Sequence, residues 1–122
     1  MNIEQILQAA EKILEPWNKE TLRPEANRVD IVMQADDLHA ATVALHEAHW
    51  GYLSAITGMD LGVDSGQMEA LYHFCSGPAI VSLRVRVPRE NTSIPSIADI
   101  LPPAIFFERE LSETLGFKVA GL

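Results

Sequence analysis

The spacing of the hydrophobic residues changes near Tyr52. Before Tyr52, most apolar residues recur three or four positions apart, which is the period of a helix buried along one side. From Tyr52 to about Val87 they alternate with polar residues, which is the period of a strand with one buried face. This change of period predicts a fold in which helices pack on an antiparallel sheet.

The first helix is expected over residues 3–15, where the apolar side chains fall on one face. Asn2 and Gln5 have the spacing of a capping box, in which each side chain bonds a backbone amide of the other. Pro16 forces the preceding residue away from helical geometry and so ends the helix. The polar stretch of residues 18–24 then predicts a loop.

A strand and a second helix are expected next. Residues 29–33 are rich in β-branched side chains, which favours a strand. Asp36 or Asp37 can cap the following helix, and Gly51 provides its stop. The buried face of that helix would contain Leu38, Ala41, Leu45 and Ala48.

Three strands of an antiparallel meander are expected over residues 52–57, 68–75 and 79–87, with Gly- and Asp-bearing turns between them. In the last strand, valine and leucine side chains alternate with polar ones, so one side should face the core. The other side should carry two cations, Arg84 and Arg86.

The end of the chain predicts a loop and two helices. Residues 89–95 form a polar loop and residues 96–99 have the pattern of a capped start to a short helix. Pro103 suits the first position of a final helix over residues 104–115, and Gly116 suits its C-cap.

The 122 residues are enough for one hydrophobic core, and 48% of them are hydrophobic and 21% charged, as in soluble globular domains. We therefore expect a single domain over residues 1–122. Its fold class should be α+β, with an antiparallel sheet of about four strands, helices packed on that sheet, and a helix near each end of the chain.

Charge and composition argue against several classes of partner. Nine basic and 17 acidic residues give a formal net charge of −8, which repels nucleic-acid phosphates and anionic lipids. No run approaches the ~20 apolar residues of a membrane-spanning helix, and no secretory signal is visible. A cytoplasmic protein without direct membrane insertion is expected. The lone Cys75 can form neither an internal disulfide nor an iron–sulfur site by itself.

Three histidines on the second helix are candidates for a metal site. His39, His46 and His49 lie within about 80° of arc, which would let them share an ion. Their arc points away from the buried face, so surface histidines are the favoured interpretation. The string from His46 to His49 is also one residue short of the zinc-protease H-E-x-x-H spacing. We expect no metal ligand here, with a metalloenzyme as an alternative.

His73 and Cys75 share a face of a predicted strand, where they could form a nucleophile pair or half of a metal site. A buried cysteine beside a hydrogen-bonded histidine is the favoured interpretation, because free cysteine is among the most buried residue types. The sequence contains neither a G-x-S-x-G elbow nor a Gly-rich phosphate loop. No catalytic and no cofactor-binding residue is therefore expected.

A cluster of charges over residues 108–113 lies on the final helix. The buried stripe of that helix is expected to consist of Ala104, Phe107, Leu111 and Leu115. Glu108 lies about 60° from the centre of the stripe and Arg109 lies nearly opposite. Glu108 should then be at least half buried, and it would need a cation or hydrogen-bond donors. We expect Arg84 or Arg86 to be its partner.

The second half of the chain resembles the C subunit of respiratory complex I, the NADH dehydrogenase 30 kDa subunit family, which also occurs in membrane-bound nickel–iron hydrogenases. The similarity is carried by a Tyr-His strand, a strand of alternating arginines, a Pro-Ser helix start and a Glu-Arg-Glu helix that ends in glycine. These motifs occupy residues 71–74, 83–88, 94–97, 103–104 and 107–110.

The resemblance implies a non-catalytic peripheral-arm subunit of an NADH:quinone oxidoreductase. It would bind no flavin, metal or cluster, and would support electron transfer by docking to the D and B subunits, at the inner face of the cell membrane. The motif corresponds to Glu108, Arg109, Glu110, Glu113 and Gly116, of which Arg109 and Glu110 are expected to contact a partner. Family members continue into a Gly-His-Pro segment, so we expect a domain truncated at its C-terminus.

Two further functions are alternatives at this stage. In the first, the chain is the equivalent subunit of a membrane-bound nickel–iron hydrogenase, in which neighbouring chains again carry the cofactors. Alternatively, it would be a small-molecule binding or regulatory α/β module that uses the strand face of His73 and Cys75.

Overall fold

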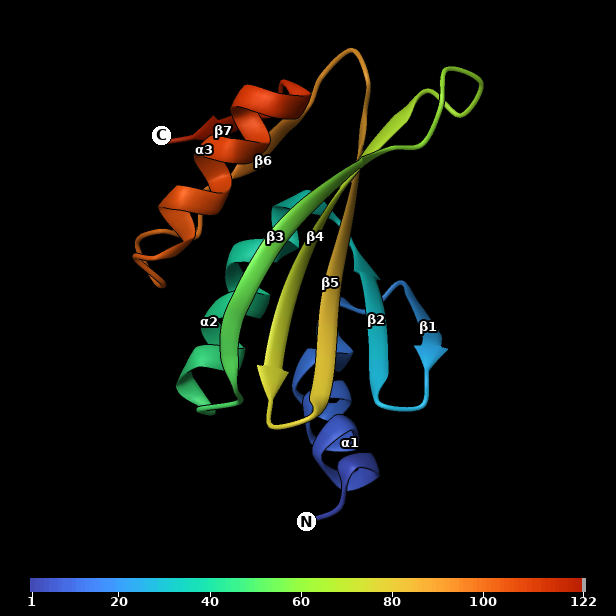
Figure 1. Ribbon diagram of the computed structural model, residues 1–122, viewed down its shortest axis with the longest axis vertical. Coiled ribbons are helices and arrows are strands. Elements are labelled where there is room, and N and C mark those ends of the chain that lie inside the picture. The colour runs from blue at the N-terminus through green and yellow to red at the C-terminus, as the bar shows by residue number, and fades with distance from the viewer. Residues whose placement is uncertain (122) are drawn as a thin grey trace.

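One five-stranded sheet forms the centre of the molecule, and the helices lie behind it and at its side in Figure 1. The structure is a computed structural model, in which residues 1–121 are described. The strands are β1 (Glu20–Glu25), β2 (Arg28–Met33), β3 (Tyr52–Asp60), β4 (Gln67–Ser76) and β5 (Ala79–Pro88). Their order in the sheet is β1-β2-β5-β4-β3. The expected α+β class is confirmed.

The sheet differs from the expected one in two respects. It has five strands instead of about four, and β2 pairs with β5 in parallel, whereas the other neighbours are antiparallel. The parallel pair arises because β2 is followed by a helix that carries the chain to the far edge of the sheet. The three-stranded meander then returns β5 to the side of β2.

Three α-helices accompany the sheet: α1 (Ile3–Leu14), α2 (Leu38–Glu47) and α3 (Ala104–Leu115). The capping box of Asn2 and Gln5 is present at the start of α1. The 3-10 turns Glu15–Trp17 and Ala35–Asp37 follow α1 and precede α2. None of the helices within residues 1–121 is long and apolar enough to cross a membrane.

The core lies between the sheet and the helices. On β5 the residues Val81, Leu83 and Val85 are fully buried, as the alternation predicted, and they meet apolar side chains of α1. The indole of Trp50 closes this layer, because its Nε1 donates to the backbone oxygen of Ile6 at 2.9 Å. The opposite alternation therefore leaves the arginines of β5 on the other face of the sheet.

Strand β1 replaces most of the loop expected over residues 18–24, and that expectation was wrong. The strand pairs only with β2, at the edge of the sheet, and five of its six residues are exposed. Such an edge strand needs no alternating apolar residues, so the period-two signal is missing. Pro24 is tolerated because it lies near the irregular register between Leu22 and Glu25.

The segment after β5 also differs from expectation. Residues 98–100 form a turn where the start of a helix was expected over residues 96–99, and Leu101 N donates to Ile97 O at 2.9 Å. Within the expected loop, β6 (Ser93–Pro95) pairs in parallel with β7 (Lys118–Ala120). This small pair fixes both ends of α3, whose bounds and Gly116 C-cap, at φ +73, agree with the prediction.

Gly51 occupies a crowded position at the start of β3. Its φ is +63, and an added Cβ would lie 2.8 Å from the carbonyl carbon of Cys75 and nearer still to its oxygen. We predict that Gly51→Ala lowers the free energy of unfolding by about 3 kcal/mol, because left-handed geometry and a rigid backbone clash act together. Denaturant unfolding measures this change.

The matched control is Gly77→Ala, which has a similar φ of +57 and open space around the added Cβ. It should lose only about 1 kcal/mol, the cost of the backbone conformation alone. Equal losses in the two variants would contradict the close approach of β3 to β4 at Gly51.

Candidate functional site

Helix α3 divides the Glu-Arg-Glu run between the interior and the surface. Glu108 is 0% exposed, whereas Arg109, Glu110 and Glu113 are exposed. The division follows from the helical advance of about 100° per residue, which places Arg109 on the side away from the sheet. The inward position expected for Glu108 is confirmed.

The carboxylate of Glu108 is held by the turn that precedes α3. Ser96 Oγ donates to Oε1 at 2.7 Å, and the backbone amide of Ile97 donates to Oε2 at 2.8 Å. Ser96 Oγ in turn accepts from the amide of Ala98 at 3.1 Å. Glu108 therefore ties α3 to the chain that leads into it, through donors that need no counter-charge.

The expected pairing of Glu108 with Arg84 or Arg86 was wrong. Both arginines project from the face of β5 that points away from the helices, while Glu108 lies on the helix side. The alternation showed that the arginines share a face, but it gave no information on which face α3 covers. The cost of burying the carboxylate is offset instead by hydrogen bonds from a backbone amide and a hydroxyl group.

A close contact with Gly58 fixes the position of α3 over the sheet. Gly58 of β3 lies beneath Leu111 and Leu115, and an added Cβ would touch the Leu111 Cδ1 at 3.3 Å and come closer to Leu115. Tyr72 is fully buried, and its hydroxyl has no hydrogen-bond partner within residues 1–121. Burial and the negative charge of Glu108 raise the pKa of Tyr72 above its usual value, so the phenol stays neutral.

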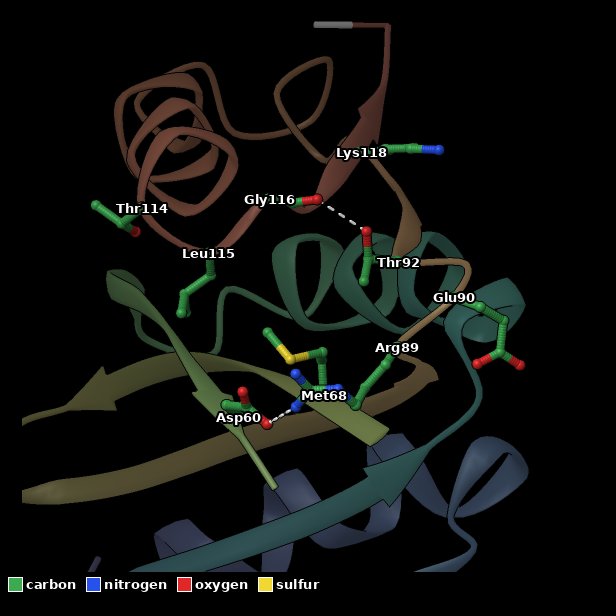
Figure 2. Close-up of a pocket in the computed structure, with 9 residues that line it drawn as sticks. All are labelled: Asp60, Met68, Arg89, Glu90, Thr92, Thr114, Leu115, Gly116 and Lys118. Atoms are coloured by element: carbon green, nitrogen blue, oxygen red, sulfur yellow. Dashed lines mark hydrogen bonds and ion pairs between the residues drawn. The ribbon is translucent and has the colours of Figure 1, made fainter. Parts of the chain in front are cut away.

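A pocket of about 430 Å³ opens beside the C-terminal end of α3 (Figure 2). Asp60 and Arg89 form an ion pair on its wall, and this contact lowers the pKa of Asp60 below its usual value. Thr92 Oγ1 donates to the backbone oxygen of Gly116 at 2.8 Å, which links the loop after β5 to the end of α3. Glu90 and Lys118 also line the pocket, so its wall carries charges of both signs beside the end of the motif helix.

The arginines of β5 belong to a charged network that the sequence did not predict. Arg28 binds Asp30 through two nitrogens, at 2.7 and 3.0 Å. Arg84 Nε lies 2.8 Å from Asp30 Oδ2 without hydrogen-bond alignment, and Arg86 Nε donates to Glu69 at 2.9 Å. We call these five residues the arginine face. The sequence pattern that could have revealed this face is the presence of charged residues at outward-facing positions of the neighbouring strands β2, β5 and β4.

His73 lies beside the arginine face and is held at both ring nitrogens. Nδ1 lies 2.7 Å from Ser82 Oγ, and Nε2 lies 2.9 Å from Thr57 Oγ1. The thiol of Cys75 is directed to Ser54 Oγ at 3.4 Å. The two residues share a face but engage different hydroxyls, so the geometry does not pair them as a nucleophile and its base.

The three histidines expected on the second helix lie in different surroundings, and His49 follows the end of α2 at Glu47. His39 Nε2 lies 2.9 Å from Asp99 Oδ2, which lowers the pKa of Asp99, whereas His46 and His49 are exposed near the end of the helix. Across the described part of the chain, no three His, Cys, Asp or Glu side chains are grouped closely enough to hold a metal ion.

Sequence comparison finds relatives in electron-transfer enzymes. The family described as respiratory-chain NADH dehydrogenase, 30 Kd subunit, matches residues 31–122. The C subunit of the NADH-quinone oxidoreductase of Moorella thermoacetica is 32% identical over 75% of this chain and 63% of its own length. The C subunit of the F420H2 dehydrogenase of Methanosarcina mazei is 31% identical over 53% of this chain and 42% of its own length. The chain therefore spans less than two thirds of these relatives.

Two solved structures share the fold. A trypsin-resistant fragment of Nqo5 superposes with a TM-score of 0.80 at 20% identity, covering 99% of this chain and 97% of the fragment. A chain of the membrane-bound sulfane sulfur reductase, an archaeal respiratory membrane complex, gives a TM-score of 0.81 at 22% identity, over 96% of this chain and 71% of that one. At such identities the agreement establishes the fold.

Removal of the buried carboxylate tests the role of Glu108. We predict that Glu108→Ala lowers the free energy of unfolding by about 3 kcal/mol, because it leaves the Ile97 amide buried without an acceptor. Glu108→Gln keeps one acceptor oxygen and should cost about 1 kcal/mol. The exposed Glu113→Ala on the same helix is the control and should change stability by less than about 0.5 kcal/mol. Equal effects of the two alanine variants would refute the anchoring role.

The surroundings of His73 predict a pH dependence of stability. Burial, followed by the positive charge of Arg28, lowers the pKa of His73 below its ordinary value. Between that lowered pKa and about 6.5 the unfolded chain binds more protons than the folded chain, so the free energy of unfolding should fall as pH drops below about 6.5. His73→Asn should flatten this slope, and the exposed His46→Asn should not. Identical slopes in the two variants would disprove the shift.

Proposed function

Because the chain belongs to the family of the 30 Kd subunit of respiratory-chain NADH dehydrogenase, we propose that it is a non-catalytic docking subunit of a complex I-like assembly. In this role it supports electron transfer by holding neighbouring cofactor-bearing subunits in place. The relatives include C subunits of enzymes named for NADH and for F420H2. Because the electron donor differs between these enzymes, we assign its recognition to other subunits of the assembly.

The observation that carries the proposal is the rigid presentation of charge by α3. Arg109, Glu110 and Glu113 are exposed, and their side chains make no hydrogen bond or ion pair to other residues in the described range 1–121. The helix beneath them is fixed by Glu108 and by the close contact with Gly58. Charged groups on a rigid support lose little entropy on binding and set the orientation of a partner.

The proposed partners are subunits that correspond to D and B of complex I. Docking to them would keep this chain peripheral to the membrane, on the cytoplasmic face. An exposed aromatic residue, Phe106, is 70% exposed on α3 and lies one helical turn from Arg109. Aromatic and arginine side chains together are typical of the energetic centre of an interface.

The test is co-purification of a tagged chain with the D- and B-like subunits of its source organism. We predict that the double variant Arg109→Ala/Glu110→Ala lowers recovery of these subunits about tenfold, which corresponds to ~1.4 kcal/mol of binding free energy. The folding stability should be unchanged, because both side chains are exposed.

The control is Lys12→Ala/Glu15→Ala, which removes one exposed charge of each sign from the region of α1. This variant should recover the partners as the unchanged chain does. Equal loss in both double variants would show that α3 is not the docking element. A chain that recovers neither of these partners would contradict the proposed function itself.

A further inference from the structure

The arginine face lies on the side of the sheet opposite α1 and α2 (Figure 1). Its two carboxylates are nevertheless removed from water, since Asp30 is 0% and Glu69 1% exposed. They are covered by the arginine side chains that bind them, of which Arg84 is 20% and Arg86 35% exposed. The outermost charged groups of this face are therefore guanidinium groups.

The guanidinium groups differ in how many of their donors are used. Arg28 donates hydrogen bonds to Asp30 through Nε and one terminal nitrogen. Arg86 donates only through Nε, to Glu69, and Arg84 approaches Glu69 no closer than 3.9 Å with its Nη1. The terminal nitrogens of Arg84 and Arg86 thus make no hydrogen bond to any residue in the described range 1–121. These nitrogens form the edge of the guanidinium that binds a carboxylate through two parallel bonds.

The two arginines have a defined spacing. They are two residues apart on β5, so their side chains leave the same face about 7 Å apart. The buried carboxylates beneath them hold the guanidinium groups in position, which reduces the entropy lost when a partner binds. Glu20 is a further carboxylate on this face, but it belongs to β1, two strands away from β5, or about 10 Å.

An apolar border adjoins the arginine pair. Met59 of β3 is opposite Glu69 in the sheet register and is 49% exposed, although it is a large hydrophobic side chain. Leu71 of β4 lies opposite Arg84 and is 5% exposed. A partner that covers Met59 would exclude water from the neighbouring arginines and so strengthen their contact with an anion.

We propose that the arginine face docks an acidic segment of a neighbouring subunit, in which two carboxylates about 7 Å apart accept hydrogen bonds from Arg84 and Arg86. Two side chains at alternate positions of an extended segment have this spacing. The choice of an acidic partner rests on local charge complementarity, because the arginine face carries three guanidinium groups against two carboxylates. The proposal rests on the proposed function as an assembly subunit and adds a second contact surface, remote from α3.

Photo-crosslinking in the assembly tests the proposal. The full chain carries p-benzoylphenylalanine in place of Met59, the tagged assembly is isolated and irradiated, and the crosslinked peptides are identified by mass spectrometry. We expect crosslinks to a segment of another subunit that contains two acidic residues at alternate positions. The same amino acid in place of Lys12, which is exposed on α1, serves as the control and should not capture that segment.

Substitutions then test the role of the guanidinium groups. Arg86→Gln should lower the yield of the Met59 crosslink about tenfold, and Arg86→Lys should lower it too, because lysine keeps the charge but loses the two-pronged geometry. Arg23→Gln removes the same charge on the helix side, where Arg23 pairs with Glu4, and should leave the yield unchanged. Thermal unfolding of each variant shows whether it is folded.

The outcomes separate this proposal from the proposed function. Recovery of the D- and B-like subunits without a Met59 crosslink, or with crosslinks only to segments that lack carboxylates, overturns the arginine-face proposal and leaves the docking function intact. Crosslinks to a second copy of this chain overturn it as well. A crosslink that survives Arg86→Gln unchanged does the same. Failure to recover any partner subunit overturns both.

Discussion

The buried carboxylate of Glu108 determines how the C-terminal part of the chain is arranged. It accepts hydrogen bonds from the Ile97 amide and the Ser96 hydroxyl, and these bonds fix α3 relative to the turn before it. With Glu108 directed inward, the helical period places Arg109 and Glu110 outward. Moving the helix would leave a carboxylate and an amide buried without partners, at a cost of several kcal/mol. The orientation of the exposed side of α3 is therefore set by the buried contacts of Glu108.

Strand β5 organises the other half of the molecule in the same way. Its inward residues, such as Leu83, form the core with α1, and its outward arginines hold the carboxylates of Asp30 and Glu69. The strand is central in the sheet, between β2 and β4, so both sets of side chains are enclosed by neighbours. The chain thus displays two rigid charged surfaces, one on a helix and one on a sheet. Both surfaces are formed by charged side chains on a support that buried carboxylates hold in place.

The sequence predicted those features that depend on local periodicity. The bounds of α3, the capping box of α1 and the meander of β3, β4 and β5 followed from patterns of a few residues each. Features that depend on distant pairing were missed. Strand β1 is exposed at the edge and has no apolar period, and β6 exists only because β7 lies beside it. The partner of Glu108 was misassigned for a related reason, since periodicity gives the faces of each element but not which faces meet.

In the proposed function, α3 contacts another subunit. Hydroxyl-radical footprinting of Phe106 tests it most directly, because this ring is 70% exposed in the isolated chain and lies on the same side of the helix as Arg109. Val63, which is 81% exposed in the turn between β3 and β4, provides the internal reference. If α3 is the docking element, oxidation of Phe106 relative to Val63 is strong in the isolated chain and falls sharply in the purified assembly. An unchanged ratio would contradict it.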